Sequence, residues 1–219
     1  MTALREQYLA AMGIPDWQLR GASEDEHPTL SIDGLDWQAL RDRVSDCKLC
    51  GLHGGRTQTV FGVGNPEANL LIVGEAPGAE EDRRGEPFVG RAGKLLDAML
   101  GAISLTRGQV YIANILKCRP PNNRDPRPEE STACTPYLER QIALLEPKVI
   151  LALGRVAAQW LLQSDSPIGR LRGRELSFGD PAIPLIASYH PAYLLRSPAA
   201  KAKSWEDLRL VRQILRASA

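Results

Sequence analysis

The chain has 219 residues, of which 43% are hydrophobic and 24% are charged. These proportions suffice for one folded core, and no apolar run approaches the roughly 18 residues of a membrane span, so we expect a soluble, cytoplasmic monomer. The net charge of +1 is divided unevenly, because residues 1–37 carry two arginines against seven acids while the remainder carries 25 basic against 19 acidic residues. This basic body favours an anionic partner.

Residues 1–36 are acidic and contain few aliphatic residues at a regular spacing. That composition is typical of a loosely ordered N-terminal extension. We expect residues 37–219 to form a single domain. Its first helix is indicated by the spacing of Trp37, Leu40 and Val44.

The four cysteines suit a single metal site. Cys47 and Cys50 form a C-x2-C pair, Cys118 follows after 67 residues, and Cys134 follows after 15 more. The chain begins without the apolar region of a secretory signal, which disfavours disulfides. Zinc and an iron-sulfur cluster both accept four thiolates, so the spacing alone leaves these two possibilities open. Four unrelated buried thiols are a third interpretation.

Short apolar runs alternate with helical periodicity beyond residue 56. The runs that predict buried strands are 68–73, 110–115, 149–153 and 183–187. The stretches that predict helices are 93–103, 129–145, 155–162 and 205–215. This alternation predicts an α/β fold, a three-layer α/β/α sandwich whose central four-stranded sheet is mostly parallel.

Polar side chains follow the predicted strands, at the edge where an open α/β sheet binds its ligand. Glu75 lies after the first strand, Asn114 at the end of the second, and His190 after the fourth. We therefore expect a carboxylate, an amide and an imidazole to converge at one edge. Taken singly, each residue also has a purely structural interpretation, such as a hydrogen bond to its own turn.

Four phrases resemble the signature of the family 4 uracil-DNA glycosylases. They are Gly74-Glu75-Ala76-Pro77-Gly78, Pro87-Phe88-Val89-Gly90-Arg91-Ala92-Gly93, Asn114-Ile115-Leu116-Lys117-Cys118-Arg119-Pro120-Pro121 and His190-Pro191-Ala192-Tyr193-Leu194. The resemblance covers the chain from about residue 47 onward. It implies an enzyme of base excision repair that flips uracil out of single- or double-stranded DNA, hydrolyses its N-glycosidic bond and leaves an abasic site. It also implies that the four cysteines hold a 4Fe-4S cluster.

The resemblance implies roles in binding the base. Asn114 matches the asparagine that reads uracil through O4 and N3–H, a pattern that cytosine reverses. Phe88 matches the aromatic platform on which the flipped base stacks. Gly74 and Ala76 belong to the same binding loop.

The resemblance also implies roles in cleavage. Glu75 would stabilise the cationic sugar or orient a water, and His190 would donate a hydrogen bond to uracil O2 as the base leaves. Better-understood uracil glycosylases have an aspartate linked to the water in this first motif, whereas Ala76 follows Glu75 here. Glu75 is therefore a candidate for that work.

The remaining implied residues would contact DNA. Leu194 matches the leucine that fills the gap left by the flipped nucleotide, with Tyr193 and Leu195 as rivals. Arg91 and Arg196 would bind phosphates. Two other function classes stay open: an iron-sulfur DNA-binding protein without turnover, and a nucleotide-binding enzyme that uses residues 74–78 as a phosphate loop. The second lacks the Gly-x-x-x-x-Gly-Lys pattern.

Overall fold

The computed structural model describes Ala11 and residues 32–217. The chain divides into two units, Met1–Ser31 and Ile32–Ala219. Most of the predicted extension 1–36 lies outside the described residues. Its last residues belong to the second unit, where Ile32–Gly34 forms a short 3-10 helix, η1.

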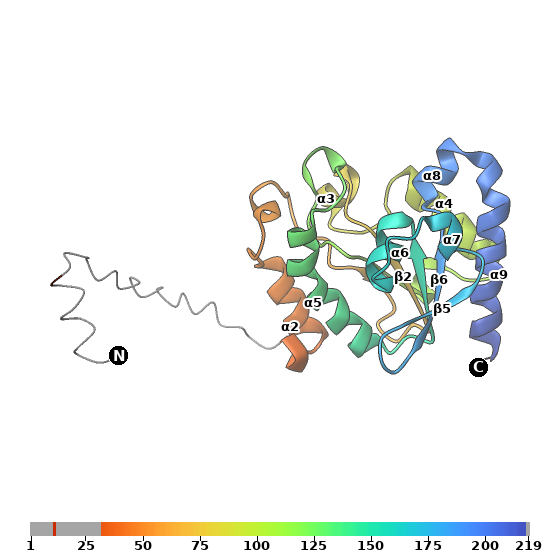
Figure 1. Ribbon diagram of the computed structural model, residues 1–219, viewed down its shortest axis with the longest axis horizontal. Helices are drawn as coiled ribbons and strands as arrows, with labels where there is room; N and C mark the ends of the chain where they lie inside the picture. Colours follow the sequence, from red (N-terminus) through yellow and green to blue (C-terminus); the bar gives the residue numbers. More distant parts are fainter. Residues whose placement is uncertain (1–10, 12–31, 218–219) are drawn as a thin grey trace. The chain divides into compact units, whose positions relative to one another are not determined.

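A six-stranded sheet forms the centre of the second unit (Figure 1). Its order is β1-β3-β2-β4-β6-β5, in which β2, β3, β4 and β6 are parallel and the edge strands β1 and β5 are antiparallel. The strands are β1 (Val63–Gly64), β2 (Leu70–Gly74), β3 (Tyr111–Asn114), β4 (Val149–Leu153), β5 (Glu175–Phe178) and β6 (Ile183–Ser188). The four predicted strands and the α/β class are confirmed, but the sheet has six strands rather than four.

Helices cover both faces of the sheet. The α-helices are α2 (Trp37–Ser45), α3 (Ala79–Arg84), α4 (Arg91–Ala102), α5 (Pro128–Leu145), α6 (Arg155–Leu162), α7 (Ile168–Leu171), α8 (Pro191–Arg196) and α9 (Lys201–Ala217). The further 3-10 helices are η2 (Gly51–Gly54), η3 (Arg107–Gln109), η4 (Pro121–Asn123) and η5 (Pro198–Ala200).

Alternate residues of the parallel strands enter two separate cores. Leu71 and Val73 of β2 belong to the core that α2, α5 and α6 complete, whereas Leu70 and Ile72 belong to the core that α4 and α9 complete. Because both faces are covered, every residue of β2 is apolar or glycine. The three-layer arrangement is therefore confirmed. In Figure 1, α4 and α9 lie on one side of the sheet and α5 lies on the other.

The strand order fixes where a ligand crevice opens. From β2 the chain passes to β3 on one side, and then crosses to β4 on the other. Such a switch point leaves a crevice at the carboxyl ends of the two strands, here β2 and β4. Glu75 and Gly154 are the residues that follow these ends. None of the helices in residues 32–217 has the length and apolar character needed to span a membrane.

Candidate functional site

The carboxyl end of β2 brings an amide and an aromatic ring together. Gly74 ends β2 and pairs in parallel register with Asn114, the last residue of β3. A Cβ at Gly74 would lie 2.3 Å from Asn114 Oδ1 and 2.8 Å from the Phe88 ring. Only glycine leaves room for both side chains, so the two predicted base-binding residues meet above it.

The loop that carries Phe88 is held in an uncommon backbone conformation. Phe88 has a φ of 54°, in the left-handed region, and is 6% exposed. Arg107 donates hydrogen bonds to the carbonyls of Pro87 and Phe88, and Glu81 accepts one from the backbone N–H of Val89. Gly93 in α4 allows the backbone of this loop to lie close to the helix, because a Cβ at Gly93 would lie 1.7 Å from Phe88 O.

His190 completes the group from β6. Its ring stacks on Phe88 with centroids 5.4 Å apart and planes inclined by 29°. Nδ1 accepts a hydrogen bond from the backbone N–H of Ala192 at 3.1 Å, which places the proton of the neutral ring on Nε2. Burial, and secondly Arg196, lower the pKa of His190 to about 4. The site thus holds a neutral imidazole with one N–H to donate.

The side chain of Asn114 has both a donor and an acceptor to offer. The residue is 3% exposed, yet its side-chain amide makes no hydrogen bond within residues 32–217. Its backbone carbonyl, in contrast, accepts from Lys117 Nζ at 2.8 Å. Among the described residues no fully enclosed side-chain nitrogen or oxygen lacks a partner, so the amide of Asn114 reaches solvent and is open to a ligand. Asn114 is therefore suited to binding a molecule with the complementary pattern.

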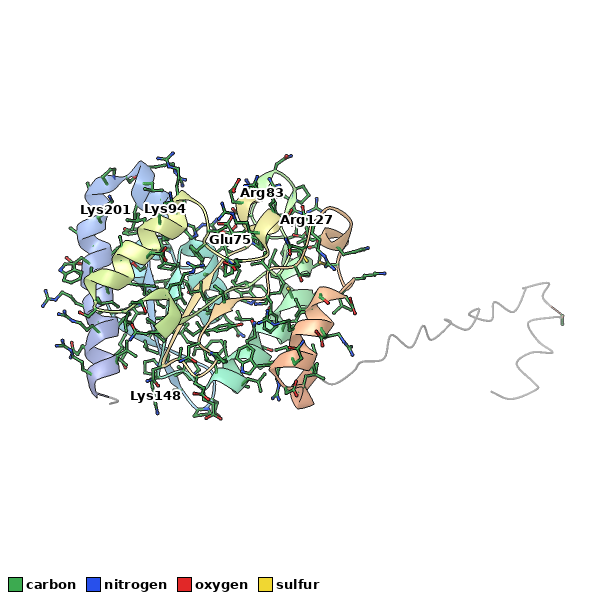
Figure 2. All side chains as sticks on the ribbon, turned by 180° about the vertical axis from the view of Figure 1, so that it is seen from behind. Glu75, Arg83, Lys94, Arg127, Lys148 and Lys201 are labelled. Atoms are coloured by element: carbon green, nitrogen blue, oxygen red, sulfur yellow. The ribbon has the colours of Figure 1, made fainter. Side chains whose placement is uncertain are left out.

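Glu75 lies at the same edge, beside a second carboxylate that the sequence did not indicate. Burial raises the pKa of Glu75 to about 7, with Asp125 adding to this increase and Arg155 opposing it. Asp125 and Arg155 form an ion pair at 2.5 Å. Asp125 lies in the proline-rich loop before α5, where no periodic pattern draws attention to it. Figure 2 shows Glu75 at one end of the molecule, with Lys148 at the opposite end.

The four cysteines line one cavity between η2, the segment after β3, and α5. All four are free thiols, and Cys118 and Cys134 are buried. Arg56 donates to Cys118 Sγ at 3.2 Å, and the backbone N–H of Lys117 donates to Cys134 Sγ at 3.3 Å. Burial raises the pKa of the Cys118 thiol and raises that of Cys134 to about 12. The donors are of the kind that stabilise sulfur ligands.

Comparison with known proteins places the chain in a family. The sequence profile described as "Uracil DNA glycosylase superfamily" matches residues 61–209. A "Type-4 uracil-DNA glycosylase" from Archaeoglobus fulgidus is 45% identical over 78% of this chain and 89% of its own length. One from Thermotoga maritima is 44% identical over 73% of this chain and 83% of its own length. This chain belongs to the type-4 uracil-DNA glycosylase family. A DNA polymerase of Bacillus phage SP01 is also similar, at 29% identity over 70% of this chain but 16% of its own length.

In this family member, burial argues against the role predicted for Leu194. Leu194 is 1% exposed and packs in the core formed with α4 and α9. Tyr193 and Leu195, its neighbours in α8, are 40% and 37% exposed. A side chain that enters DNA must reach solvent. Leu194 would have to leave this core to enter DNA, whereas Tyr193 and Leu195 are already exposed, so the role of Leu194 and of its two rivals stays a prediction.

The other predicted residues lie near the edge that carries Glu75. Arg91 begins α4 directly after the Phe88 loop, and Arg196 ends α8. Both arginines are exposed. Ala76 is partly buried and packs against the core on the α5 face. Gly74, Phe88, Asn114 and His190 thus meet directly, while phosphate binding by the arginines and base contact by Ala76 stay predictions.

Two further residues at the site were not predicted from the sequence. Arg107, from η3, holds the Phe88 loop through the carbonyls of Pro87 and Phe88. Lys117 is 1% exposed, although lysines are normally solvated. The signal that could have indicated Lys117 is its position between Asn114 and Cys118, which confines its backbone to the interior.

Proposed function

We propose that this protein is a DNA N-glycosylase that flips uracil out of DNA and hydrolyses its N-glycosidic bond, leaving an abasic site. The observation that carries the proposal is the meeting of Phe88, Asn114 and His190 around Gly74, in a chain of the type-4 uracil-DNA glycosylase family. The proposed substrate is uracil in single- or double-stranded DNA, and the proposed active form is a monomer.

Asn114 would select the base. Its Nδ2 donates to uracil O4, and its Oδ1 accepts from uracil N3–H. Cytosine presents an amino donor and an unprotonated ring nitrogen at these positions, so both partners of Asn114 would be mismatched. A binding site whose polar groups are left unpaired discriminates strongly against the wrong ligand. Phe88 would supply the stacking surface, worth about 1–3 kcal/mol per base.

His190 would stabilise the leaving uracil. Negative charge develops on uracil O2 as the bond to the sugar breaks, and a fixed donor aimed at that oxygen lowers the barrier. The hydrogen bond from Ala192 N to Nδ1 supports this role, because it leaves Nε2–H as the donor. The lowered pKa keeps the ring neutral at physiological pH.

Glu75 would act on the sugar side of the bond. The transition state has oxocarbenium character, which a carboxylate stabilises by charge or by orienting a water. Either role needs the ionised carboxylate. Burial raises the pKa of Glu75 to about 7, so the ionised form gains population as the pH rises through neutrality.

Basic side chains on both sides of Glu75 would bind the DNA backbone. Figure 2 places Lys94 and Lys201 on one side of Glu75 and Arg83 and Arg127 on the other, at the same end of the molecule. Together with Arg91 and Arg196 they would contact phosphates. Of the side chains of α8, the exposed Leu195 is the one that we propose to fill the gap in the DNA, in place of Leu194.

We further propose that the four cysteines hold a 4Fe-4S cluster. Zinc and an iron-sulfur cluster both accept four thiolates. The four free thiols line one cavity, which supports a shared site, and the similarity to type-4 uracil-DNA glycosylases favours the iron-sulfur cluster. The cluster would fasten remote segments around the site.

The test is release of uracil from labelled oligonucleotides, measured by alkaline cleavage at the abasic site. The substrates are single-stranded DNA and duplexes with uracil opposite G or A. We expect turnover by the parent, and a loss of about 100- to 1,000-fold in kcat for His190→Ala, the typical effect of removing a donor to a developing anion. Glu75→Gln and Asn114→Ala should also be impaired, whereas Lys148→Met, at the opposite end, should match the parent.

The proposal fails if the parent, with iron bound and its fold intact, binds uracil-containing DNA but releases no base. That result would favour an iron-sulfur DNA-binding protein without turnover. The cluster proposal is tested separately, by metal analysis and the visible spectrum of anaerobically purified protein. A colourless protein loaded with zinc would overturn it.

A further inference from the structure

Lys117 is a buried cation without a carboxylate partner in residues 32–217. It is 1% exposed, and its ammonium donates to Asn114 O at 2.8 Å and to Gln141 Oε1 at 2.6 Å. Both acceptors are neutral. Burying an ammonium is costly unless an opposite charge lies nearby. The position of Lys117 therefore calls for an anion that these contacts do not supply.

The cysteine cavity lies directly beside Lys117. The backbone N–H of Lys117 donates to Cys134 Sγ at 3.3 Å, and Cys118 is the next residue in the chain. Lys117 itself forms part of the wall of the cavity. A 4Fe-4S cluster held by four thiolates carries a net negative charge. Such a cluster would supply the counter-charge that Lys117 lacks.

The same residue is attached to the uracil-reading edge. Besides the bond from Lys117 Nζ to Asn114 O, the segment after Asn114 runs along the end of β2, where Ile115 N donates to Gly74 O and Leu116 N to Glu75 O, both at 3.0 Å. On its other side, Gln141 is oriented by a hydrogen bond from Nε2 to Phe61 O at 2.9 Å. A displacement of the ammonium of Lys117 would therefore change the position of Asn114.

We propose that Lys117 is a positioning residue that couples the cluster to recognition of the base. Its ammonium offsets the negative charge of the cluster and at the same time holds the carbonyl of Asn114, so that an intact cluster fixes the end of β3. This inference rests on the proposed function and on the proposed cluster. It gives the cluster of a hydrolytic enzyme a role in specificity that needs no electron transfer.

The first part of the proposal, that the ammonium offsets the charge of the cluster, is tested with Lys117→Met. This variant keeps the length of the side chain and removes its charge. Lys148→Met is the matched control, since Lys148 is exposed at the opposite end of the molecule. Voltammetry of the iron-loaded proteins should give a more negative reduction potential for Lys117→Met alone, because a nearby cation favours the more negative, reduced cluster. Iron should also be lost to a chelator several-fold faster from this variant.

The second part of the proposal, that Lys117 positions Asn114, is tested on the same iron-loaded proteins. Lys117 holds a backbone carbonyl and touches no reacting atom, so we expect the KM for uracil-containing DNA to rise about ten-fold or more while kcat changes less. Amide hydrogen exchange in residues 112–117 should become faster. A merely structural lysine would lower the melting temperature but leave the potential and the KM unchanged.

Gln141→Glu is a second variant of nearly unchanged size, which keeps the test decisive if Lys117→Met does not fold. It places a carboxylate against the ammonium and weakens its field at the cluster, so the potential should again move to more negative values. If every foldable variant keeps the potential and KM of a parent that excises uracil, the inference is wrong and the proposed function stands. A parent without iron and without uracil release would instead refute the proposals on which the inference rests.

Discussion

Two titratable residues of the site have pKa values shifted in opposite directions. Burial, and then Asp125, raise the pKa of Glu75 to about 7, whereas burial, and then Arg196, lower that of His190 to about 4. Excision as proposed requires an ionised Glu75 and a neutral His190. His190 is already neutral where Glu75 begins to ionise. The rate should therefore rise with pH through about 7 because of Glu75.

Asp125→Asn should move this rise to lower pH. Removing the negative charge beside Glu75 makes its carboxyl easier to ionise, so at about pH 6 the variant should be faster than the parent. Arg155→Met should have the opposite effect, because Arg155 favours the ionised form. Single-turnover rates measured on both sides of neutrality check both shifts. Glu75→Gln should lack the rise altogether, and an unmoved profile for Asp125→Asn would contradict the role assigned to Asp125.

The sequence predicts where these residues lie in the fold but not what surrounds them. Glu75, Asn114 and His190 were expected at one edge because the ends of parallel strands must meet there. Their environment was not predictable, since Asp125 reaches Glu75 from a loop about fifty residues away. The proton position on His190 likewise depends on one hydrogen bond from Ala192.

At the scale of elements, α4 and the loop before it form one unit. Gly93→Ala should destabilise the protein, because its Cβ would lie 1.7 Å from the carbonyl oxygen of Phe88. The expected loss is about 1–3 kcal/mol, as for other overpacked sites. Gly101→Ala in the same helix is the control, since nothing lies within 4 Å of its Cβ. It should be neutral or stabilising by up to about 1 kcal/mol. Chemical denaturation measures the free energy of unfolding of both variants. Equal values would contradict the close approach of Gly93 to the carbonyl oxygen of Phe88.

Arg107 should affect substrate binding through the same loop. Arg107→Met removes the hydrogen bonds to the carbonyls of Pro87 and Phe88, which releases the left-handed conformation at Phe88. We expect KM to rise several-fold, with a smaller change in kcat, because Phe88, the proposed stacking surface, is no longer fixed. Arg209→Met, at an exposed arginine of α9, controls for the loss of one positive charge. Equal KM values for the two variants would contradict the role of Arg107 in substrate binding.

The predictability of an element depended on how many of its faces are buried. Strands β2, β3 and β4 are buried along their whole length and appear in the sequence as continuous apolar runs. The edge strand β1 has two residues, and Gly64 is needed there because a Cβ would lie 1.9 Å from Val110 O. The edge strand β5 has no fully buried residue. Neither edge strand gives a continuous run, so the sequence predicted four strands rather than six.

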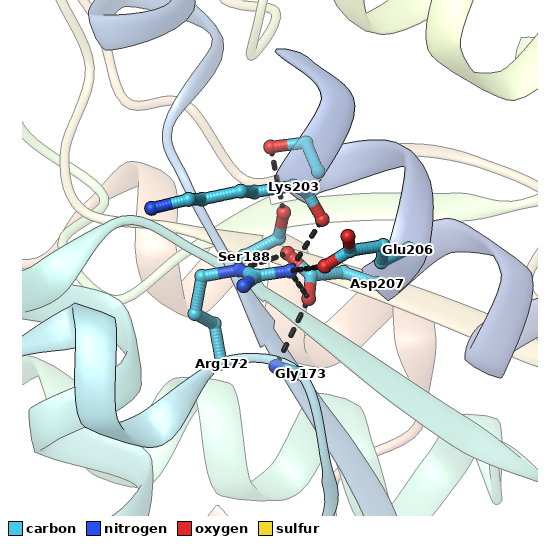
Figure 3. A network of polar contacts seen from close by, with 7 residues as sticks. Arg172, Gly173, Ser188, Lys203, Glu206 and Asp207 are labelled. Atoms are coloured by element: carbon cyan, nitrogen blue, oxygen red, sulfur yellow. Dashed lines mark hydrogen bonds and ion pairs between the residues drawn. The ribbon is translucent and has the colours of Figure 1, made fainter. Parts of the chain in front are cut away.

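At the scale of the whole molecule, one polar network ties the last helix to the sheet (Figure 3). Arg172 donates to both oxygens of Asp207 in α9, at 3.1 and 2.8 Å, and Gly173 N donates to Asp207 Oδ1 at 3.0 Å. Ser204 of α9 accepts from Ser188 at 3.1 Å. Ser188 ends β6, two residues before His190. The network therefore joins the C-terminal helix to the strand that leads to His190, the proposed leaving-group donor.

Removing Arg172 should destabilise the whole unit. The side chain of Asp207 is 0% exposed and that of Arg172 is 11% exposed, so Arg172→Met leaves a buried carboxylate without its cation. We expect a loss of about 3–5 kcal/mol in the free energy of unfolding, measured by chemical denaturation.

Arg83→Met is the matched control, because the ion pair of Arg83 with Glu80 is 66% and 48% exposed and should contribute less than about 1 kcal/mol. Similar losses in the two variants would mean that Asp207 finds other partners or water. A much larger loss for Arg172→Met would mean that the position of β6, and with it that of His190, depends on charge pairing with α9 as well as on the apolar core.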